Sequence, residues 1–240
     1  MTKTRIARMA ELRRALPIAA ALLMLGALLV PMWRITFLAP QYPTTELVVE
    51  LYAYPRLGGD FAEVQALNKY VGFYYPDPVL LEPNYEVHEK AIRTPEWVLG
   101  PVTFLAMAAT GLFVALAPTE RKLRLGLTAQ LVGTLSVLVV MFAVIQYRLY
   151  QAGHALDPDA PLMGVEGFTP PVLGGYAVAN ISGFAWFGPG GYMVALAVVL
   201  LAGAYLCRGS RATVGDLPRL VRERFEKGES DDRPPAPGGD

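Results

Sequence analysis

The chain has 240 residues, a formal net charge of zero, a 53% hydrophobic fraction and 18% charged residues. A soluble domain of this length rarely combines these values, which are typical of a multi-pass membrane protein with modest polar loops. The single cysteine, Cys207, excludes an intramolecular disulfide and a metal site built on two thiolates of one chain. Phosphate-binding glycine loops, dinucleotide-binding motifs and zinc-protease motifs are absent from the sequence, which disfavours those enzyme classes.

Four apolar runs predict membrane-spanning helices, since about 20 apolar residues cross the hydrocarbon core of a bilayer as a helix. A basic segment, 1–14, precedes the first run. We interpret that run as an uncleaved anchor because it is long and lacks a cleavage site for signal peptidase. The predicted spans are 15–33, 97–117, 125–147 and 190–206. The segments between and after them are 34–96, 118–124, 148–189 and a tail, 207–240, expected to be disordered from about 228.

The distribution of basic residues predicts the orientation of these spans. Four spans place both termini on one side of the membrane, and that side carries 15 of the 21 lysines and arginines. Basic residues accumulate in cytoplasmic loops. We therefore expect a bacterial inner-membrane protein with both termini in the cytoplasm and with 34–96 and 148–189 facing outward.

The first outward segment predicts a strand, a turn and a helix. Residues 46–54 are rich in Val, Leu and Tyr, and a turn at 57–59 precedes a helix over 60–72. Asp60 with Glu63 has the spacing of a capping box, and Gly72 is a natural helix stop. The predicted fold is an α-helical membrane protein with four transmembrane helices and a small α+β extracytoplasmic domain formed by the two outward loops.

An apolar stripe and an aromatic stretch are candidates for partner docking. The stripe recurs at helical spacing on 60–72, so it must be buried on the strand, the second outward segment, the membrane surface or a partner protein. The aromatic stretch follows it and is stiffened by prolines. It is either an interfacial aromatic belt or a platform for a partner or ligand. The predicted docking residues are Phe61, Val64, Leu67, Phe73, Tyr74 and Tyr75.

The second outward segment is rich in glycine and proline and holds the candidate metal ligands His154, Asp157 and Met163. Oxygen ligands with one histidine suit a divalent ion, whereas histidine with methionine suits copper. The alternative is that Asp157 belongs to a turn and that His154 makes a local hydrogen bond. A short helix over 84–93 is also predicted, with His88 on it.

The predicted spans contain no Asp, Glu, Lys, Arg or His, and Gln130 and Gln146 are their most polar residues. Ion pathways and proton relays normally need ionisable groups inside the membrane, which disfavours a transporter or pump. Both histidines lie outside the spans, which excludes a haem held between transmembrane histidines. The sequence shows no arrangement of nucleophile, base and orienting group, so we expect a protein that is not an enzyme.

The loops resemble a family of small integral membrane proteins often encoded beside nitrous oxide reductase maturation genes, which handle copper. The resemblance lies in the motifs at 39–43, 59–60, 67–72, 153–161 and 170–174, together with Asn180. It implies a role in handling copper or in assembling a periplasmic respiratory enzyme. The chain departs from the family's Leu-Asn-His-Tyr-Ile-Gly-Met at two positions, where Lys69 replaces the histidine and Phe73 the methionine. Neither residue binds copper as found, so a metal role would centre on His154.

These observations lead to a hypothesis of function. We expect a non-enzymatic membrane accessory or assembly protein that presents its outward domain to a respiratory or periplasmic metalloenzyme system, with copper as the candidate metal. The expected partners are the lipid bilayer and a membrane or periplasmic protein, and no nucleic acid. The alternative is a structural subunit of a larger membrane complex without a metal role.

Overall fold

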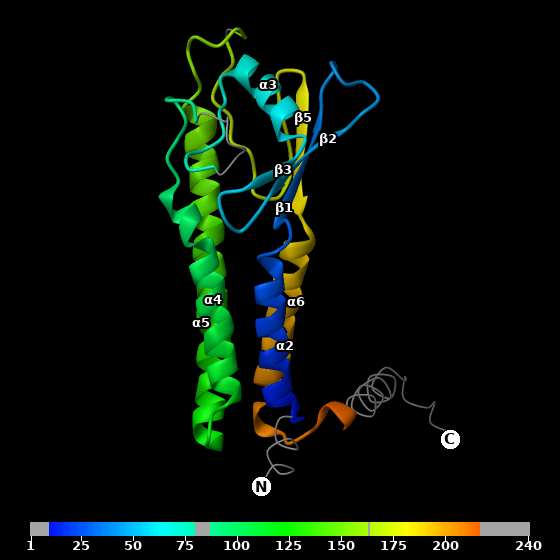
Figure 1. Ribbon diagram of the computed structural model, residues 1–240, viewed down its shortest axis with the longest axis vertical. Coiled ribbons are helices and arrows are strands. Elements are labelled where there is room, and N and C mark those ends of the chain that lie inside the picture. Colours follow the sequence, from blue (N-terminus) through cyan, green and yellow to red (C-terminus); the bar gives the residue numbers. More distant parts are fainter. Residues whose placement is uncertain (1–9, 80–86, 163, 217–240) are drawn as a thin grey trace, which may run out of the picture.

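The computed structural model describes residues 10–79, 87–162 and 164–216 and has an α+β fold (Figure 1). Short 3₁₀ turns cover Pro95–Leu99, Cys207–Gly209 and Val214–Asp216. The strands are β1 (Trp33–Leu38), β2 (Leu47–Leu51), β3 (Leu57–Gly59), β4 (Gly174–Val178) and β5 (Ile181–Phe187). The helices are α2 (Leu12–Ala27), α3 (Phe61–Val71), α4 (Gly100–Ala115), α5 (Glu120–His154) and α6 (Pro189–Leu206).

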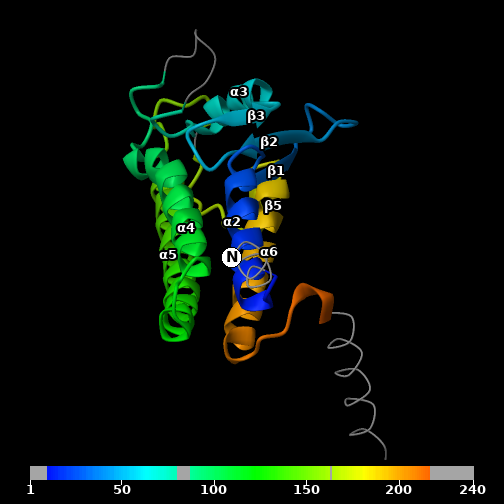
Figure 2. The same ribbon diagram turned by 60° about the horizontal axis from the view of Figure 1, so that its bottom comes forward.

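The helices other than α3 form a long bundle with the sheet at one end. α2 runs along α6, α4 lies beside α5, and α2 also packs on α4 (Figures 1 and 2). The contact surfaces are filled by small and flexible apolar side chains such as Ala20, Met24 and Ala197. Three helical stretches are long and apolar enough to cross a membrane, namely Pro95–Ala115, Glu120–His154 and Pro189–Gly209. They agree with three of the four predicted spans.

The first predicted span, 15–33, is wrong at its end. The helix α2 stops at Ala27, and its 16 residues correspond to about 24 Å, less than a bilayer core requires. Pro31 disfavours helical geometry in the residue before it, and the Met32 N–H donates to the Leu51 carbonyl at 2.7 Å. The apolar run therefore continues as the strand β1 instead of as helix.

The helix α5 is longer than the predicted span 125–147 at both ends. The Thr119 hydroxyl accepts the Lys122 N–H at 3.3 Å and caps a helix that already begins at Glu120, within the predicted loop 118–124. Its 35 residues correspond to about 52 Å, far more than the roughly 30 Å of a hydrocarbon core. The excess carries the last turns of α5, up to His154, into the domain that contains the sheet.

The two segments predicted to face outward build a single antiparallel sheet with the strand order β3-β2-β1-β5-β4. The central pair, β1 and β5, joins the two segments in register from Trp33 opposite Phe187 to Leu38 opposite Ser182. β1 leads directly out of α2 and β5 leads directly into α6 (Figure 1). The predicted strand 46–54 is confirmed over Leu47–Leu51 as β2, whereas the turn predicted at 57–59 is wrong, because these residues pair with β2 as β3. An α+β domain built from the two loops is confirmed in outline.

One face of the sheet is covered and the other carries exposed side chains. Val64, at 0% exposure, and Leu67 project from α3 onto a core that includes Phe37 and Val49. On the opposite face, Phe184 and Trp186 are about half exposed. The sheet therefore has an inner face under α3 and an outer face, and we use these two names below.

The predicted helix 60–72 is confirmed, but its predicted capping box is wrong. α3 spans Phe61–Val71 and ends at Gly72, which has a left-handed φ of 80°. Asp60 occupies the N-cap position without a side-chain bond to the helix, because its carboxylate accepts the N–H of Val48 in β2 instead. The sheet competes successfully with the helix for this carboxylate.

The opposite end of the bundle is tied by a buried arginine. The Arg14 Nη1 donates to the carbonyls of Ala115 at 2.6 Å and Ala117 at 3.0 Å. Ala115 is the last residue of α4 and Ala117 follows its C-cap, so Arg14 satisfies carbonyls that the helix itself leaves without a partner. Of the predicted helix 84–93, residues 87–93 form turns and residues 84–86 lie outside the described residues. The tail from 217 onward, including the predicted disorder from about 228, lies outside them too.

Candidate functional site

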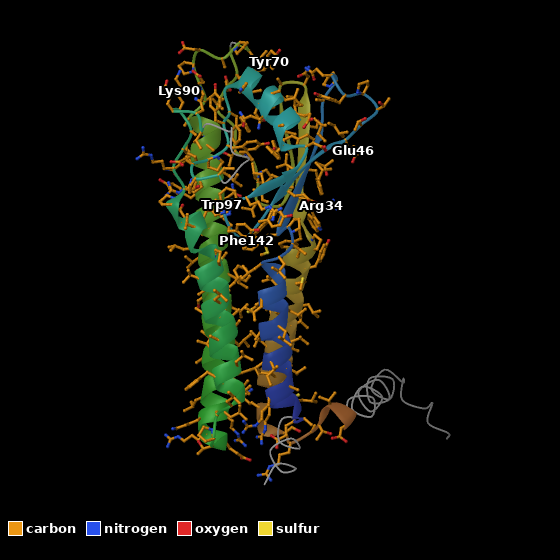
Figure 3. All side chains as sticks on the ribbon, in the orientation of Figure 1. Arg34, Glu46, Tyr70, Lys90, Trp97 and Phe142 are labelled. Carbon is orange, nitrogen blue, oxygen red and sulfur yellow. The ribbon has the colours of Figure 1, made fainter. Side chains whose placement is uncertain are left out.

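Three segments meet beside the C-terminal end of α3. They are the stretch after α3 with Tyr74, the turns around Lys90, and the loop 155–162 that follows α5. Figure 3 shows Lys90 and Tyr70 near this end of the domain, far from the helical bundle's other end. This junction gathers one predicted metal ligand and one predicted docking residue, and we describe it as the candidate site.

Asp157 is the centre of the junction. Its carboxylate accepts bonds from Lys90 Nζ at 2.5 Å, from the Tyr74 hydroxyl at 3.2 Å and from the Asp159 N–H at 3.0 Å. Lys90 also contacts Asp159 at 3.0 Å. The bond from Lys90 holds the pKa of Asp157 below its ordinary value, and the two carboxylates raise the pKa of Lys90. The pair is therefore fully charged at neutral pH.

His88 packs against the same junction. Its ring stacks on Tyr74 with 3.7 Å between the ring centroids, and its Nδ1 accepts the Lys90 N–H at 3.3 Å. Burial raises the pKa of Tyr74, and the hydrogen bond to Asp157 raises it further. Tyr74 is thus a neutral donor held between a histidine and a carboxylate.

Backbone contacts bring α3 and the loop 155–162 together. The Gly72 carbonyl accepts the Asp157 N–H at 2.9 Å, and the Tyr70 carbonyl accepts the Leu162 N–H at 3.0 Å. A Cβ at position 72 would lie 2.7 Å from the Asp157 nitrogen. Glycine at 72 therefore serves both the left-handed helix end and this close approach.

An open hollow of about 460 Å³ lies between α3 and the loop. The outward side of α3 forms one wall, and Tyr70 there is 59% exposed. The sequence reasoning missed this wall because it followed the apolar stripe of the helix and ignored its polar side. The residues that line the hollow include Lys69, Tyr70, Tyr74, Asp157, Asp159 and Pro161.

The candidate metal ligands do not form a donor set here. His154 ends α5 with its Nδ1 2.9 Å from the Tyr150 carbonyl, as in the alternative interpretation of a local hydrogen bond. The Asp157 carboxylate is engaged by the Lys90 ammonium, and Met163 lies outside the described residues. Across 10–79, 87–162 and 164–216, no three His, Cys, Asp or Glu residues gather as a metal site would require. The two candidate ligands that the structure describes, His154 and Asp157, are therefore each engaged by other groups of the chain.

The predicted docking residues face the chain itself. Val64, Leu67 and Tyr75 are buried in the core between α3 and the sheet, and Phe61 packs at its margin. The inward orientation predicted for the stripe is confirmed, and the partner that it meets is the sheet. Phe73 lies against Phe168 of the second outward segment, with 5.9 Å between ring centroids.

Polar side chains near the C-terminal end of α5 form hydrogen bonds and an ion pair with neighbouring segments. Gln146 Nε2 donates to the Pro170 carbonyl at 3.2 Å, and its Oε1 accepts the Val172 N–H at 3.0 Å. Arg148 forms a two-point ion pair with Glu96, which precedes α4. The side chains at the outward end of α5 thus fix the loop before β4 and the start of α4.

Comparison of the chain with protein-family models, curated proteins and solved structures finds no match.

Proposed function

We propose that the chain is a non-enzymatic membrane accessory or assembly protein that holds a preformed α+β platform outside a bacterial inner membrane. The main support for this proposal is that ion pairs between charged side chains connect distant segments of the chain. Lys90 with Asp157 and Arg148 with Glu96 each join parts of the chain more than 50 residues apart. Such contacts favour a rigid binding platform, because the conformational entropy of these segments is then lost on folding and not when a partner binds.

The charge distribution supports the orientation. At the bundle end opposite the sheet, Arg13, Arg124 and Arg211 surround Glu120, and Arg121 and Lys122 are exposed beside it. The sheet end has fewer basic residues, and several of them are paired with carboxylates. In the proposed topology α2 and the apolar residues 28–32 that follow it cross the membrane beside α6 and complete the set of four spans, and the sheet faces the periplasm.

The hollow beside α3 is the surface that we propose for the partner. Tyrosine is enriched at the energetic centres of protein interfaces because its ring supplies contact area and its hydroxyl a hydrogen bond. Tyr70 is exposed at the margin of the hollow, next to the charges of Lys69 and Asp159. A respiratory or periplasmic protein with an apolar knob and flanking charges would fit this surface.

Site-specific photocrosslinking in cells tests the proposal. A photoreactive residue at Tyr70 is expected to yield one discrete crosslinked product, whereas the same residue at Arg56, an exposed position on the β2–β3 turn, is expected to yield none of it. Identical products from both positions, or no product from position 70, would contradict the proposal. A partner that stays bound in constant proportion through mild-detergent purification would favour the alternative of a structural subunit.

A copper-related form of this role requires a separate test, because the arrangement described above would have to change before copper could bind. Titration of the purified protein with Cu(I) and Cu(II) measures it directly. Sub-micromolar binding that His154→Ala abolishes would support the copper-related form. If neither ion binds, the role of the chain is partner assembly alone.

A further inference from the structure

The outer face of the sheet carries a row of three side chains that lie side by side on adjacent strands. Arg34 of β1 is paired in register with Trp186 of β5 on one side and with Glu50 of β2 on the other. Residues paired in this way have Cβ atoms about 5 Å apart. The row therefore presents an aromatic ring, a cation and an anion in a line across the sheet.

The row lies at the end of the sheet nearest the helical bundle. Trp186 stands just before α6, and its indole N–H donates at 2.8 Å to the hydroxyl of Tyr192, in the first turn of that helix. Figure 3 shows Arg34 where the sheet meets the helices. Exposed tryptophan and tyrosine at the end of a membrane span are typical of the lipid headgroup layer. With α6 in a membrane, as the proposed function requires, the row stands at headgroup depth.

Arg34 is open to a ligand, and the Glu50 side chain, which is 23% exposed, is accessible in part. The Arg34 side chain is 54% exposed and meets Glu50 through one contact of 3.1 Å, between Nη2 and Oε1. A guanidinium has five N–H donors, so most of them remain for an oxyanion, and its planar fork matches phosphate. Beyond Glu50 the paired residue is Gly58, which has no side chain to cover the carboxylate.

An ion pair with one largely exposed partner, as Arg34 is here, contributes little to stability, so the fold alone gives weak reason for it. The apolar side of α6 continues below the row. Leu196 and Val199 are exposed and lie four and seven residues after Tyr192, which places the three on one side of the helix. A molecule with a charged head and an apolar tail would meet the row and this side of α6 together.

We propose that this row binds the headgroup of a phospholipid that carries an ammonium group, phosphatidylethanolamine. Arg34 donates to the phosphate, and Glu50 accepts from the ammonium, which an ethylene link joins to the phosphate. Trp186 and Tyr192 flank the glycerol region, and the acyl chains follow Leu196 and Val199. An anionic headgroup without an ammonium meets the Glu50 carboxylate and binds less tightly.

Native mass spectrometry of the full-length protein tests this site. The delipidated protein is offered equal amounts of phosphatidylethanolamine and phosphatidylglycerol with the same acyl chains. The wild type is expected to retain phosphatidylethanolamine about tenfold better, as for a charge-assisted hydrogen bond. Arg34→Gln is expected to lose retention of both lipids. Glu50→Gln is expected to keep a bound lipid and to lose the preference between them, which also shows that the variant is folded.

The matched control is Arg56→Gln, since Arg56 is also an exposed arginine of the outward domain but packs over the Tyr52 ring. It is expected to leave lipid retention unchanged. Equal retention of both lipids by the wild type, or unchanged retention in Arg34→Gln, would overturn the proposal. Equally strong competition by soluble glycerophosphoethanolamine, at the same concentration as the lipid, would overturn the assignment to a membrane lipid, because the acyl chains along α6 would then contribute nothing to binding. None of these readouts involves the hollow beside α3, so partner crosslinking at Tyr70 can fail or succeed independently.

Discussion

Asp60 and Val48 exchange two hydrogen bonds. The Asp60 N–H donates to the Val48 carbonyl at 2.8 Å, and the Val48 N–H donates to Asp60 Oδ2 at 2.9 Å. Asp60 uses its backbone N–H for one bond and its side-chain carboxylate for the other. The residue before α3 therefore pairs with β2 much as a residue of an adjacent strand would. This pair fixes the position of α3 on the inner face of the sheet.

Asp60→Ala should therefore loosen α3 from the sheet. It leaves the Val48 N–H without its charged acceptor, and we expect a loss of about 1.5–3 kcal/mol in unfolding free energy. Denaturant unfolding of the detergent-solubilised protein measures it. Glu63→Ala is the control, because Glu63 is an exposed acidic residue in the first turn of the same helix. Equal losses in both variants would show that charge near the helix end, and not the bond to Val48, matters.

Gly72→Ala should be more harmful than the same change at Gly164. Both glycines have a left-handed φ, 80° and 78°, which costs an alanine about 1–2 kcal/mol. At Gly164 nothing lies within 4 Å of a new Cβ, whereas at Gly72 the Asp157 backbone lies within 3 Å. We expect Gly72→Ala to lose at least about 1 kcal/mol more, as for overpacking. Thermal unfolding of the two variants side by side checks the difference, and equal shifts would contradict the close contact.

Gln146→Leu should release the loop that leads into β4. It removes the donor to the Pro170 carbonyl and the acceptor of the Val172 N–H. Loss of a bond worth about 1.4 kcal/mol would accelerate amide exchange near Val172 about tenfold. Hydrogen exchange with mass spectrometry measures this rate. Gln130→Leu is the control, since Gln130 bonds to the Met107 carbonyl in α4, and it should leave exchange in the loop unchanged.

The ion pair between Lys90 and Asp157 should make the thermal stability of the domain depend on pH. The pKa of Asp157 is lower in the folded domain than its ordinary value of 3.8. The contact therefore stabilises the domain above about pH 4, and this contribution disappears as the pH falls through the folded pKa. Thermal midpoints between pH 2 and 7 measure the effect. Asp157→Asn should remove this part of the pH dependence. Asp159→Asn is the control and should retain it, because the Asp159 side chain is 85% exposed.

Elements with a strong local signal were predictable from the sequence. The stop at Gly72 and the apolar side of α3 need only local geometry, and the structure has both. The long apolar runs of α4, α5 and α6 likewise carry their own signal. The side chain of Asp60 was mispredicted because its choice between helix and strand depends on where the chain places β2.

The sheet was harder to predict because the local signals of its two central strands, β1 and β5, are masked in different ways. In β5 the outer face carries Phe184 and Trp186, so apolar residues occur on both faces and hide the two-residue period. β1 does alternate, with Arg34 and Thr36 on the outer face, but it directly follows an apolar run that predicts helix. The junction around Asp157 depends on pairings between distant segments, and Lys90 gives no local sign of its partner.

The pairing of β1 with β5 also sets the order in which the domain can be completed. β1 is synthesised soon after α2, but the strand that covers its second edge begins only at Ile181, after α4 and α5. Until then β1, β2 and β3 present an open edge to their surroundings, a known hazard for mispairing. Completion of the domain is therefore coupled to the synthesis of the last hairpin, β4 and β5, and ribosome-arrested chains that stop short of β5 should be the ones that chaperones and proteases recognise.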